Sequence, residues 1–198
     1  MFKIPLNEEK EEVVTIDGFP PARSQDVLSN EIIAVLGYGV QERTQSLNLR
    51  ENGFNIIIGI EWNDPIWNKA GSEGWEDGKN LFSVEGACDR ATFVCHSLSE
   101  GGNIGWWPVI KKRLFGGKAF CFSHASSFYN DNSDVVFPLD IDVIILSSKK
   151  FGGNVRGLFA KGGETAVGYS ILQNFSGQAE EKAMAYGIAI GSKYLLKR

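Results

Sequence analysis

Short apolar runs alternate with amphipathic segments along most of the chain. Ile32–Leu36 and Asn55–Ile60 are apolar at successive positions, which is typical of strands buried on both faces of a sheet. Val40–Asn52, between them, is predicted to be a helix, and Gly53 suits the left-handed position that ends a helix. The connections are short, so this strand–helix–strand unit should have parallel strands.

The same alternation continues toward the carboxyl end. Further strands are expected at Leu81–Phe82, Thr92–Ser97, Ala119–Ser123, Val143–Ser147 and Thr165–Leu172. Further helices are expected at Ile66–Ser72, Val84–Arg90, Trp106–Leu114, Val155–Ala160 and Gln178–Ile190. The pattern predicts an α/β doubly wound fold with a mostly parallel sheet, a Rossmann-like NAD(P)-binding fold. Ligands of such folds bind at the carboxyl ends of the strands.

Domain organisation follows from the same pattern. Residues 1–30 are expected to form an irregular leader, because Pro20-Pro21 breaks a helix. Residues 31–198 are expected to form a single dinucleotide-binding-type domain. The length of 198 residues suits one such domain, and a hydrophobic content of 43% is ample for its core.

Composition excludes several classes of partner. No apolar run approaches the roughly 20 residues that a membrane-spanning helix needs, so no membrane partner is expected. The net charge is −4 without a basic stretch, so no nucleic-acid partner is expected.

Three cysteines without a CxxC pair indicate buried thiols in a reducing compartment. The acidic start, Met1–Glu12, is unlike a targeting peptide, which predicts a cytoplasmic protein or a mature organellar form.

A glycine turn follows the first apolar strand and opens the first predicted helix. Gly37 permits the tight turn, and Gly39 allows a pyrophosphate to approach the backbone amides of the helix. The third position of this fingerprint, which is usually glycine, is Glu42. The two glycines therefore predict a dinucleotide site, and the alternative is a tight turn without a ligand.

The charges around this turn leave two outcomes open. Glu42 can cap the amide donors of the helix, or it can repel a pyrophosphate. At ~6 Å and an effective dielectric of ~20, such repulsion costs on the order of 3 kcal/mol, or about a hundredfold in affinity. Arg43 offsets this if its side chain turns toward the phosphates. Glu61, after the second strand, predicts NAD(H) over NADP(H), because an acidic residue there holds the ribose 2′-hydroxyl. The alternative for Glu61 is a solvated loop carboxylate.

Several short segments occur in an order that resembles a known family. They are Ile33-Ala34-Val35-Leu36-Gly37-Tyr38-Gly39-Val40-Gln41, Asn48-Leu49-Arg50, Gly78–Glu85, Leu98-Ser99-Glu100, Phe122-Ser123-His124, Asp140–Ile144, Val155-Arg156 and Ala189–Ser192. Together they resemble the ketol-acid reductoisomerases (acetohydroxy acid isomeroreductases), and Gly78–Glu85 resembles the fungal-type members. The resemblance covers nearly all of residues 30–196.

This resemblance implies an oxidoreductase of valine and isoleucine biosynthesis. Enzymes of the family isomerise 2-acetolactate in an Mg²⁺-dependent step and then reduce the product with NADPH. Their amino-terminal domain binds the nucleotide, and a carboxyl-terminal helical domain supplies the ligands of Mg²⁺. The sequence ends at Arg198, where that helical domain would begin, so we expect it to be absent and expect no Mg²⁺ site in this chain.

The resemblance also implies site residues. His124 and Lys149 match catalytic positions of the family, with a packed histidine and a solvated loop cation as the alternatives. The predicted cofactor-binding residues are Gly37, Tyr38, Gly39, Gln41, Arg43, Glu61 and Ser99. Glu42 stands where the family has its third glycine. Glu61, Trp62 and Ile66 stand where the family has the basic pair and the serine that hold a 2′-phosphate, so those three residues are lost here. His96 and Cys95 are discounted as a catalytic pair, because adjacent strand residues point to opposite faces.

Three functions therefore remain open. The first is a degenerate reductoisomerase domain, a pseudoenzyme that binds NAD(H) or another ADP-containing ligand without completing the reaction. The second is a fragment or subunit of an active ketol-acid reductoisomerase that another chain completes. The third is a non-enzymatic interaction module that binds a protein, with a homodimer as one form and the stretch Gly101–Trp107, rich in tryptophan and glycine, as an interface.

Overall fold

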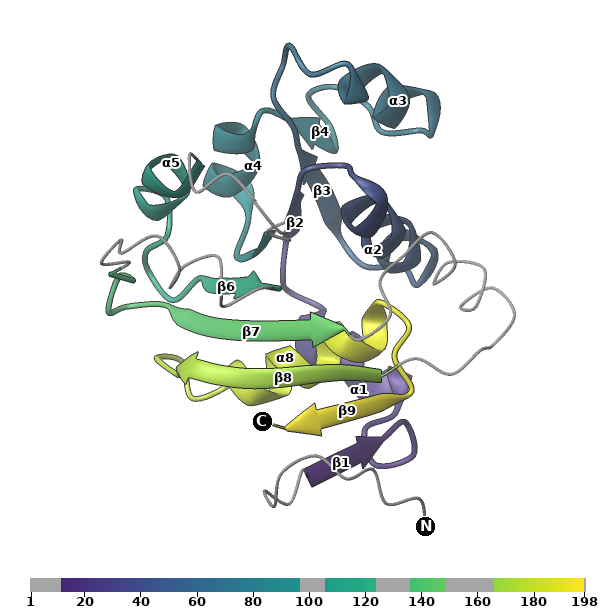
Figure 1. Cartoon of the computed structure of the whole chain (residues 1–198), viewed down its shortest axis with the longest axis vertical. Helices are drawn as coiled ribbons and strands as arrows, with labels where there is room; N and C mark the ends of the chain where they lie inside the picture. Colours follow the sequence, from purple (N-terminus) through teal and green to yellow (C-terminus); the bar gives the residue numbers. More distant parts are fainter. Residues whose placement is uncertain (1–11, 97–105, 124–135, 149–165, 198) are drawn as a thin grey trace.

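A computed structural model describes residues 12–96, 106–123, 136–148 and 166–197. Within these residues nine strands form one sheet in the order β1-β9-β8-β7-β6-β5-β2-β3-β4 (Figure 1). The strands are β1 (Glu12–Thr15), β2 (Ile33–Leu36), β3 (Ile56–Gly59), β4 (Leu81–Phe82), β5 (Phe93–His96), β6 (Ala119–Phe122), β7 (Asp142–Ser148), β8 (Ala166–Gln173) and β9 (Tyr194–Lys197).

The central part of the sheet is parallel. Strands β2 to β7 run in one direction, while β8 pairs antiparallel with β7 and β1 pairs antiparallel with β9. From β2 the chain moves outward to β3 and β4, and then returns to the other side of β2 as β5. The order reverses at β2 and β5, and the crevice outside their carboxyl ends is the usual ligand site of this fold.

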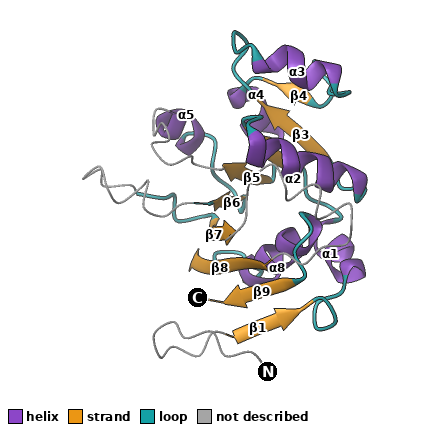
Figure 2. Cartoon of the chain, turned by 45° about the vertical axis from the view of Figure 1, so that its right-hand side comes forward, coloured by secondary structure: helices purple, strands orange, loops and turns teal. Residues whose placement is uncertain are grey.

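Six helices within the described residues cover both faces of the sheet (Figure 2). They are α1 (Pro21–Leu28), α2 (Val40–Glu51), α3 (Ile66–Ser72), α4 (Val84–Arg90), α5 (Trp107–Lys111) and α8 (Ala179–Ala189). Ile33 and Val35 of β2 pack in one buried cluster with residues of α1, α2 and α8, whereas Ala34 and Leu36 pack in another with residues of α4 and α5. This alternation of side chains confirms the doubly wound α/β fold.

Residues 12–30 were expected to belong to an irregular leader, but they contain regular elements. Residues 12–15 form β1 at the edge of the sheet, and residues 21–28 form α1. Pro21 is the first residue of α1, where proline is tolerated because its missing N–H has no partner within the helix. Phe19 and Leu28 are buried in the core, so this segment is part of the folded domain.

Other elements also differ from the prediction. Strand β9 was not predicted, and α5 ends at Lys111 rather than Leu114. The helix predicted at Val155–Ala160 lies outside the described residues. The three cysteines are buried free thiols, as expected. No helix in the described ranges is long and apolar enough to cross a membrane.

Candidate functional site

A cavity of about 470 Å³ lies at the carboxyl ends of β2, β3 and β5. The glycine turn after β2 forms one wall, and residues following β3 form another. Its described lining residues are Leu36, Gly37, Tyr38, Gly39, Glu42, Gly59, Ile60, Glu61, Asp64, Ile66, Val84, His96, Trp106 and Ile110. The cavity therefore occupies the crevice where the strand order reverses, as the fold predicts.

The glycine turn is built as the dinucleotide fingerprint requires. Gly37 has a φ of 94°, a left-handed conformation that favours glycine, and its N–H donates to the carbonyl of Gly59 at 2.7 Å. Gly39 is the N-cap residue of α2, so the amino-terminal amides of this helix open beside the turn. The turn thus presents a positive helix end to the cavity.

Glu42 folds back over this turn. A β-carbon at Gly39 would lie only 2.7 Å from Oε2 of Glu42, and one at Gly37 would lie 3.5 Å from its Cγ. Glu42 is the third residue of α2, a position from which a carboxylate can reach the backbone at the start of a helix. The carboxylate occupies the space that the two glycines leave for a phosphate.

Arg43 does not line the cavity and pairs with Glu73. Its Nε donates to both carboxylate oxygens of Glu73, at 2.9 and 2.8 Å. Tyr38 donates its hydroxyl to the same carboxylate at 2.6 Å and accepts a hydrogen bond from Nε1 of Trp75 at 2.7 Å. The hydrogen bond from Arg43 lowers the pKa of Glu73, and burial together with Glu73 raises the pKa of Tyr38. The guanidinium therefore neutralises Glu73 rather than a ligand.

The end of the cavity beyond β3 is acidic. Glu61 and Asp64 both line it and are exposed, and Oδ1 of Asp64 accepts a hydrogen bond from the N–H of Ile66 at 2.9 Å. Trp62 is 65% exposed beside Trp67, with ring centroids 4.9 Å apart. Every charged side chain among the described lining residues is acidic, which disfavours highly anionic ligands.

His96 lines the opposite part of the cavity, at the end of β5. Burial lowers its pKa to about 4, although a hydrogen bond with the backbone of Leu36 opposes this effect. Among the described residues its Nδ1 has no hydrogen-bond partner. Cys95 packs in the cluster of the other sheet face, which confirms that the two side chains do not form a pair. His96 was not among the predicted site residues, although its position at the carboxyl end of a predicted strand is where this fold binds ligands.

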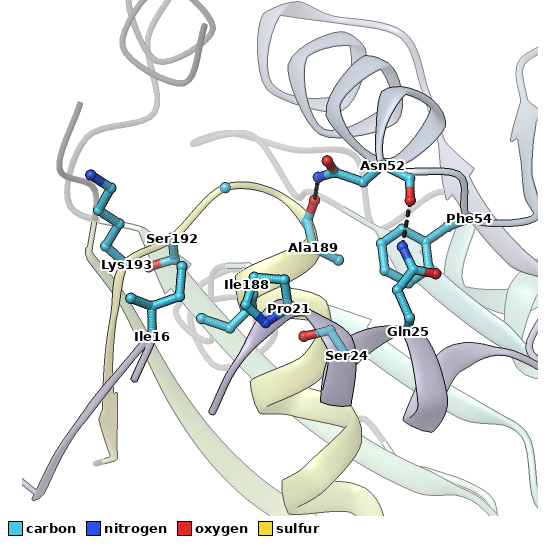
Figure 3. A pocket seen from close by; sticks show the side chains of 11 residues that line it. Ile16, Pro21, Ser24, Gln25, Asn52, Phe54, Ile188, Ala189, Ser192 and Lys193 are labelled. Atoms are coloured by element: carbon cyan, nitrogen blue, oxygen red, sulfur yellow. Dashed lines mark hydrogen bonds between the residues drawn. The ribbon is translucent and has the colours of Figure 1, made fainter. Parts of the chain in front are cut away.

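A second cavity, of about 230 Å³, lies between α1 and the carboxyl end of α8 (Figure 3). Its wall is mainly apolar, with Ile16, Phe54 and Ile188 among the lining residues. Asn52 donates to the carbonyl of Ala189 at 2.8 Å beside it. It adjoins neither the glycine turn nor an acidic strand end, so it lacks the features of a dinucleotide site.

The structure separates the predicted site residues into three groups. Those that line the cavity at the strand ends are Gly37, Tyr38, Gly39 and Glu61. Gln41 and Arg43 do not line it, although they belong to the same helix. Ser99, His124 and Lys149 lie outside the described residues, and their roles remain predictions. In the described part of the chain no group of three or more His, Cys, Asp and Glu side chains is arranged to hold a metal ion.

Comparison with known families agrees with this geometry. Residues 27–194 match the model of the NADPH-binding domain of acetohydroxy acid isomeroreductase. The chain belongs to the ketol-acid reductoisomerase family. The match covers the glycine turn, the strand ends around the cavity and strands β2 to β8.

Individual ketol-acid reductoisomerases support the assignment. The chain is 43% identical over 187 residues to "Ketol-acid reductoisomerase (NAD(+))" of Desulfosudis oleivorans, covering 94% of this chain and 53% of that protein. It is 41% identical over 187 residues to the mitochondrial ketol-acid reductoisomerase of Neurospora crassa, covering 94% of this chain and 46% of that protein. The chain thus spans about half the length of these curated relatives.

A solved structure of a ketol-acid reductoisomerase shares the fold. The NADH-preferring enzyme from an uncultured archaeon superposes with a TM-score of 0.83 at 28% identity. The superposition covers 94% of this chain and 56% of that one. The nucleotide-binding fold of the family is therefore present in the residues that the structure describes.

Proposed function

We propose that this chain is the dinucleotide-binding part of a ketol-acid reductoisomerase and that it prefers NAD(H) to NADP(H). The observation that carries this proposal is the pair of carboxylates, Glu61 and Asp64, that line the cavity beyond β3. In this fold the adenosine ribose is held at the end of the second strand of the nucleotide-binding unit, which is β3 here. A carboxylate there accepts hydrogen bonds from a ribose hydroxyl and repels a 2′-phosphate.

The residues otherwise suit such a ligand. The glycine turn, the amino-terminal end of α2 and the cavity volume provide the phosphate cradle and the space beside it. The names of two relatives, an NAD(+) enzyme and an NADH-preferring enzyme, agree with an unphosphorylated cofactor. Bound there, the dinucleotide would supply the hydride for the reduction that the family resemblance implies. Glu42 alone conflicts with its pyrophosphate.

We further infer that the chain by itself binds the cofactor without completing the isomeroreductase reaction. The family resemblance assigns the Mg²⁺ ligands to a helical domain, and the chain spans about half of its curated relatives. A degenerate domain and a fragment completed by another chain both fit this proposal. Incubation with Mg²⁺, NADH and 2-acetolactate should therefore give no turnover by the isolated chain.

The mitochondrial fungal relatives favour the organellar form over a cytoplasmic protein.

Calorimetric titration tests the cofactor preference. The wild-type chain is expected to bind NADH at least about tenfold tighter than NADPH, because even one added charge near a carboxylate costs a few kcal/mol. The double substitution Glu61→Gln, Asp64→Asn should bring the two affinities closer, mainly by improving NADPH binding. The amide oxygen that Asp64→Asn introduces would still accept a hydrogen bond from the N–H of Ile66.

The control is Glu76→Gln, which removes an exposed carboxylate outside the cavity lining and should leave the ratio unchanged. Tighter binding of NADPH than NADH by the wild-type chain contradicts the preference. If no nucleotide binds and light scattering shows a dimer, the interaction-module hypothesis replaces the proposed function.

A further inference from the structure

The phosphate cradle of this chain has its own negatively charged group beside it. Gly39 lacks a side chain. A β-carbon added to it would lie 2.7 Å from Oε2 of Glu42. Cγ of the same side chain lies 3.5 Å from the corresponding point at Gly37. The carboxyl group therefore covers both glycines of the turn.

The position of Glu42 on α2 explains why its side chain lies over Gly37 and Gly39. It is the third residue of a helix of 12 residues, and Gly39, the N-cap residue, makes no side-chain cap. A carboxylate in the first turn is favoured by the helix dipole and can satisfy amides that have no partner in the helix. The carboxylate of Glu42 therefore lies where a bound phosphate lies in other proteins of this fold.

The neighbouring cation does not relieve the conflict. Arg43 is bound to Glu73 through both carboxylate oxygens, and Glu73 also accepts from Tyr38. Release of the guanidinium would leave the Glu73 carboxylate without its cation, which costs free energy. A pyrophosphate arriving at the turn therefore meets the negative charge of Glu42, and the described cavity lining contains no Lys or Arg to offset it.

Resting on the proposed function, we propose that Glu42 is an internal ligand of the phosphate cradle and sets the affinity of the site for pyrophosphate-containing ligands. A dinucleotide binds only after the carboxylate has rotated out of the turn. Two anionic groups cannot share the same few amides, so the cost of displacement appears in the affinity of every ligand that carries a pyrophosphate. Ligands that contain only the adenosine part do not incur this cost.

Two variants of Glu42 and two ligands test the proposal by calorimetry. Glu42→Gln keeps the shape and removes the charge, and Glu42→Ala removes the group. Both should bind ADP-ribose at least about tenfold more tightly than the wild-type chain, while the affinity for adenosine changes less than about twofold. The matched control is Glu51→Gln at the other end of α2, which should leave both affinities unchanged.

Thermal melting without ligand adds a second measurement. Glu42→Ala should melt a few degrees lower than the wild-type chain, because the first turn of α2 loses its carboxylate. Glu42→Gln keeps a side chain of the same shape and should melt closer to the wild-type chain. If the wild-type chain binds ADP-ribose and the variants bind it no more tightly, the assignment of Glu42 is wrong and the proposed function stands. If no variant and no wild-type chain binds ADP-ribose, the proposed function fails, and the assignment fails with it. Binding by the variants alone supports the assignment of Glu42 and contradicts dinucleotide binding by the wild-type chain.

Discussion

The chemical role of each residue in or near the cavity depends on the groups that its side chain contacts. Glu42 and Arg43 are neighbours on α2, yet the first folds over the glycine turn and the second reaches Glu73. Their opposite charges therefore do not cancel at the phosphate cradle. His96 illustrates the same rule, because its burial at the end of β5 keeps the ring neutral at pH 7. A neutral imidazole accepts a hydrogen bond at one nitrogen and carries no charge that would attract a phosphate.

The lowered pKa of His96 predicts a pH-dependent stability. The unfolded chain takes up a proton on His96 below about pH 6.5, whereas the folded chain does so only near pH 4. The contribution of the neutral His96 ring to the free energy of unfolding is therefore complete above pH 6.5, and it is lost as the pH falls toward 4. Urea denaturation at about pH 5.5 should show a free energy of unfolding lower by about 1 kcal/mol than at about pH 7.5. In His96→Gln this part of the difference should disappear; an unchanged difference would contradict the burial of the ring.

At the scale of elements, α8 shows how small residues set the distance between a helix and the sheet. Ala179, Ala183 and Ala185 are fully buried against the core. Gly187 faces β9, where a β-carbon would lie 2.6 Å from Cδ2 of the buried Leu195. The small-residue pattern of 178–190 thus reflects close packing, as interpreted from the sequence, rather than a ligand site.

Two glycine substitutions separate packing from helix propensity. Gly187→Ala should lower the free energy of unfolding by about 1–3 kcal/mol, because the added methyl group overpacks against Leu195. Gly71→Ala in α3 adds its methyl group to open space and should raise the same quantity by about 0.5–1 kcal/mol. Chemical denaturation of both variants measures the difference, and a destabilising effect of equal size at the two sites would contradict this account.

At the scale of the whole molecule, one buried ion cluster joins three distant parts of the chain. Nζ of Lys182 in α8 lies 3.1 Å from Glu31, before β2, and 3.5 Å from Asp142 at the start of β7. Asp142 is fully buried and also accepts hydrogen bonds from the N–H and hydroxyl of Ser176. Thr92, before β5, donates its hydroxyl to Glu31. The cluster ties the amino-terminal segment and the carboxyl-terminal helix to the central sheet.

Removal of the cation from this cluster should destabilise the whole domain. Lys182→Met leaves two carboxylates with little access to solvent and without their cation, which is expected to cost about 3–5 kcal/mol of unfolding free energy. Lys79→Met breaks the exposed pair with Glu76 and should cost no more than about 0.5 kcal/mol. Equilibrium unfolding in urea compares the two, and similar small losses for both would show that the cluster contributes little.

Much of the fold and part of the site followed from local patterns. The strands and helices from Ile32 to Arg90 lie within a residue or two of their predicted bounds, because apolar runs and glycine turns act over a few neighbouring residues. Gly37, Gly39 and Glu61 line the cavity because their places at strand ends are set by the fold. Strand β1 and helix α1 could not be predicted, since β1 depends on pairing with β9 and α1 on packing against α8.

By itself the amino-acid sequence determined the alternation of strands and helices, the glycine turn, the acidic end of the site and the resemblance to a family. Only the tertiary structure decided which way Glu42 and Arg43 point, and that His96 borders the same cavity. The physical reason is that these directions depend on partners far away in the chain. Arg43 is 30 residues from Glu73, and Lys182 meets Glu31 only when the chain has folded.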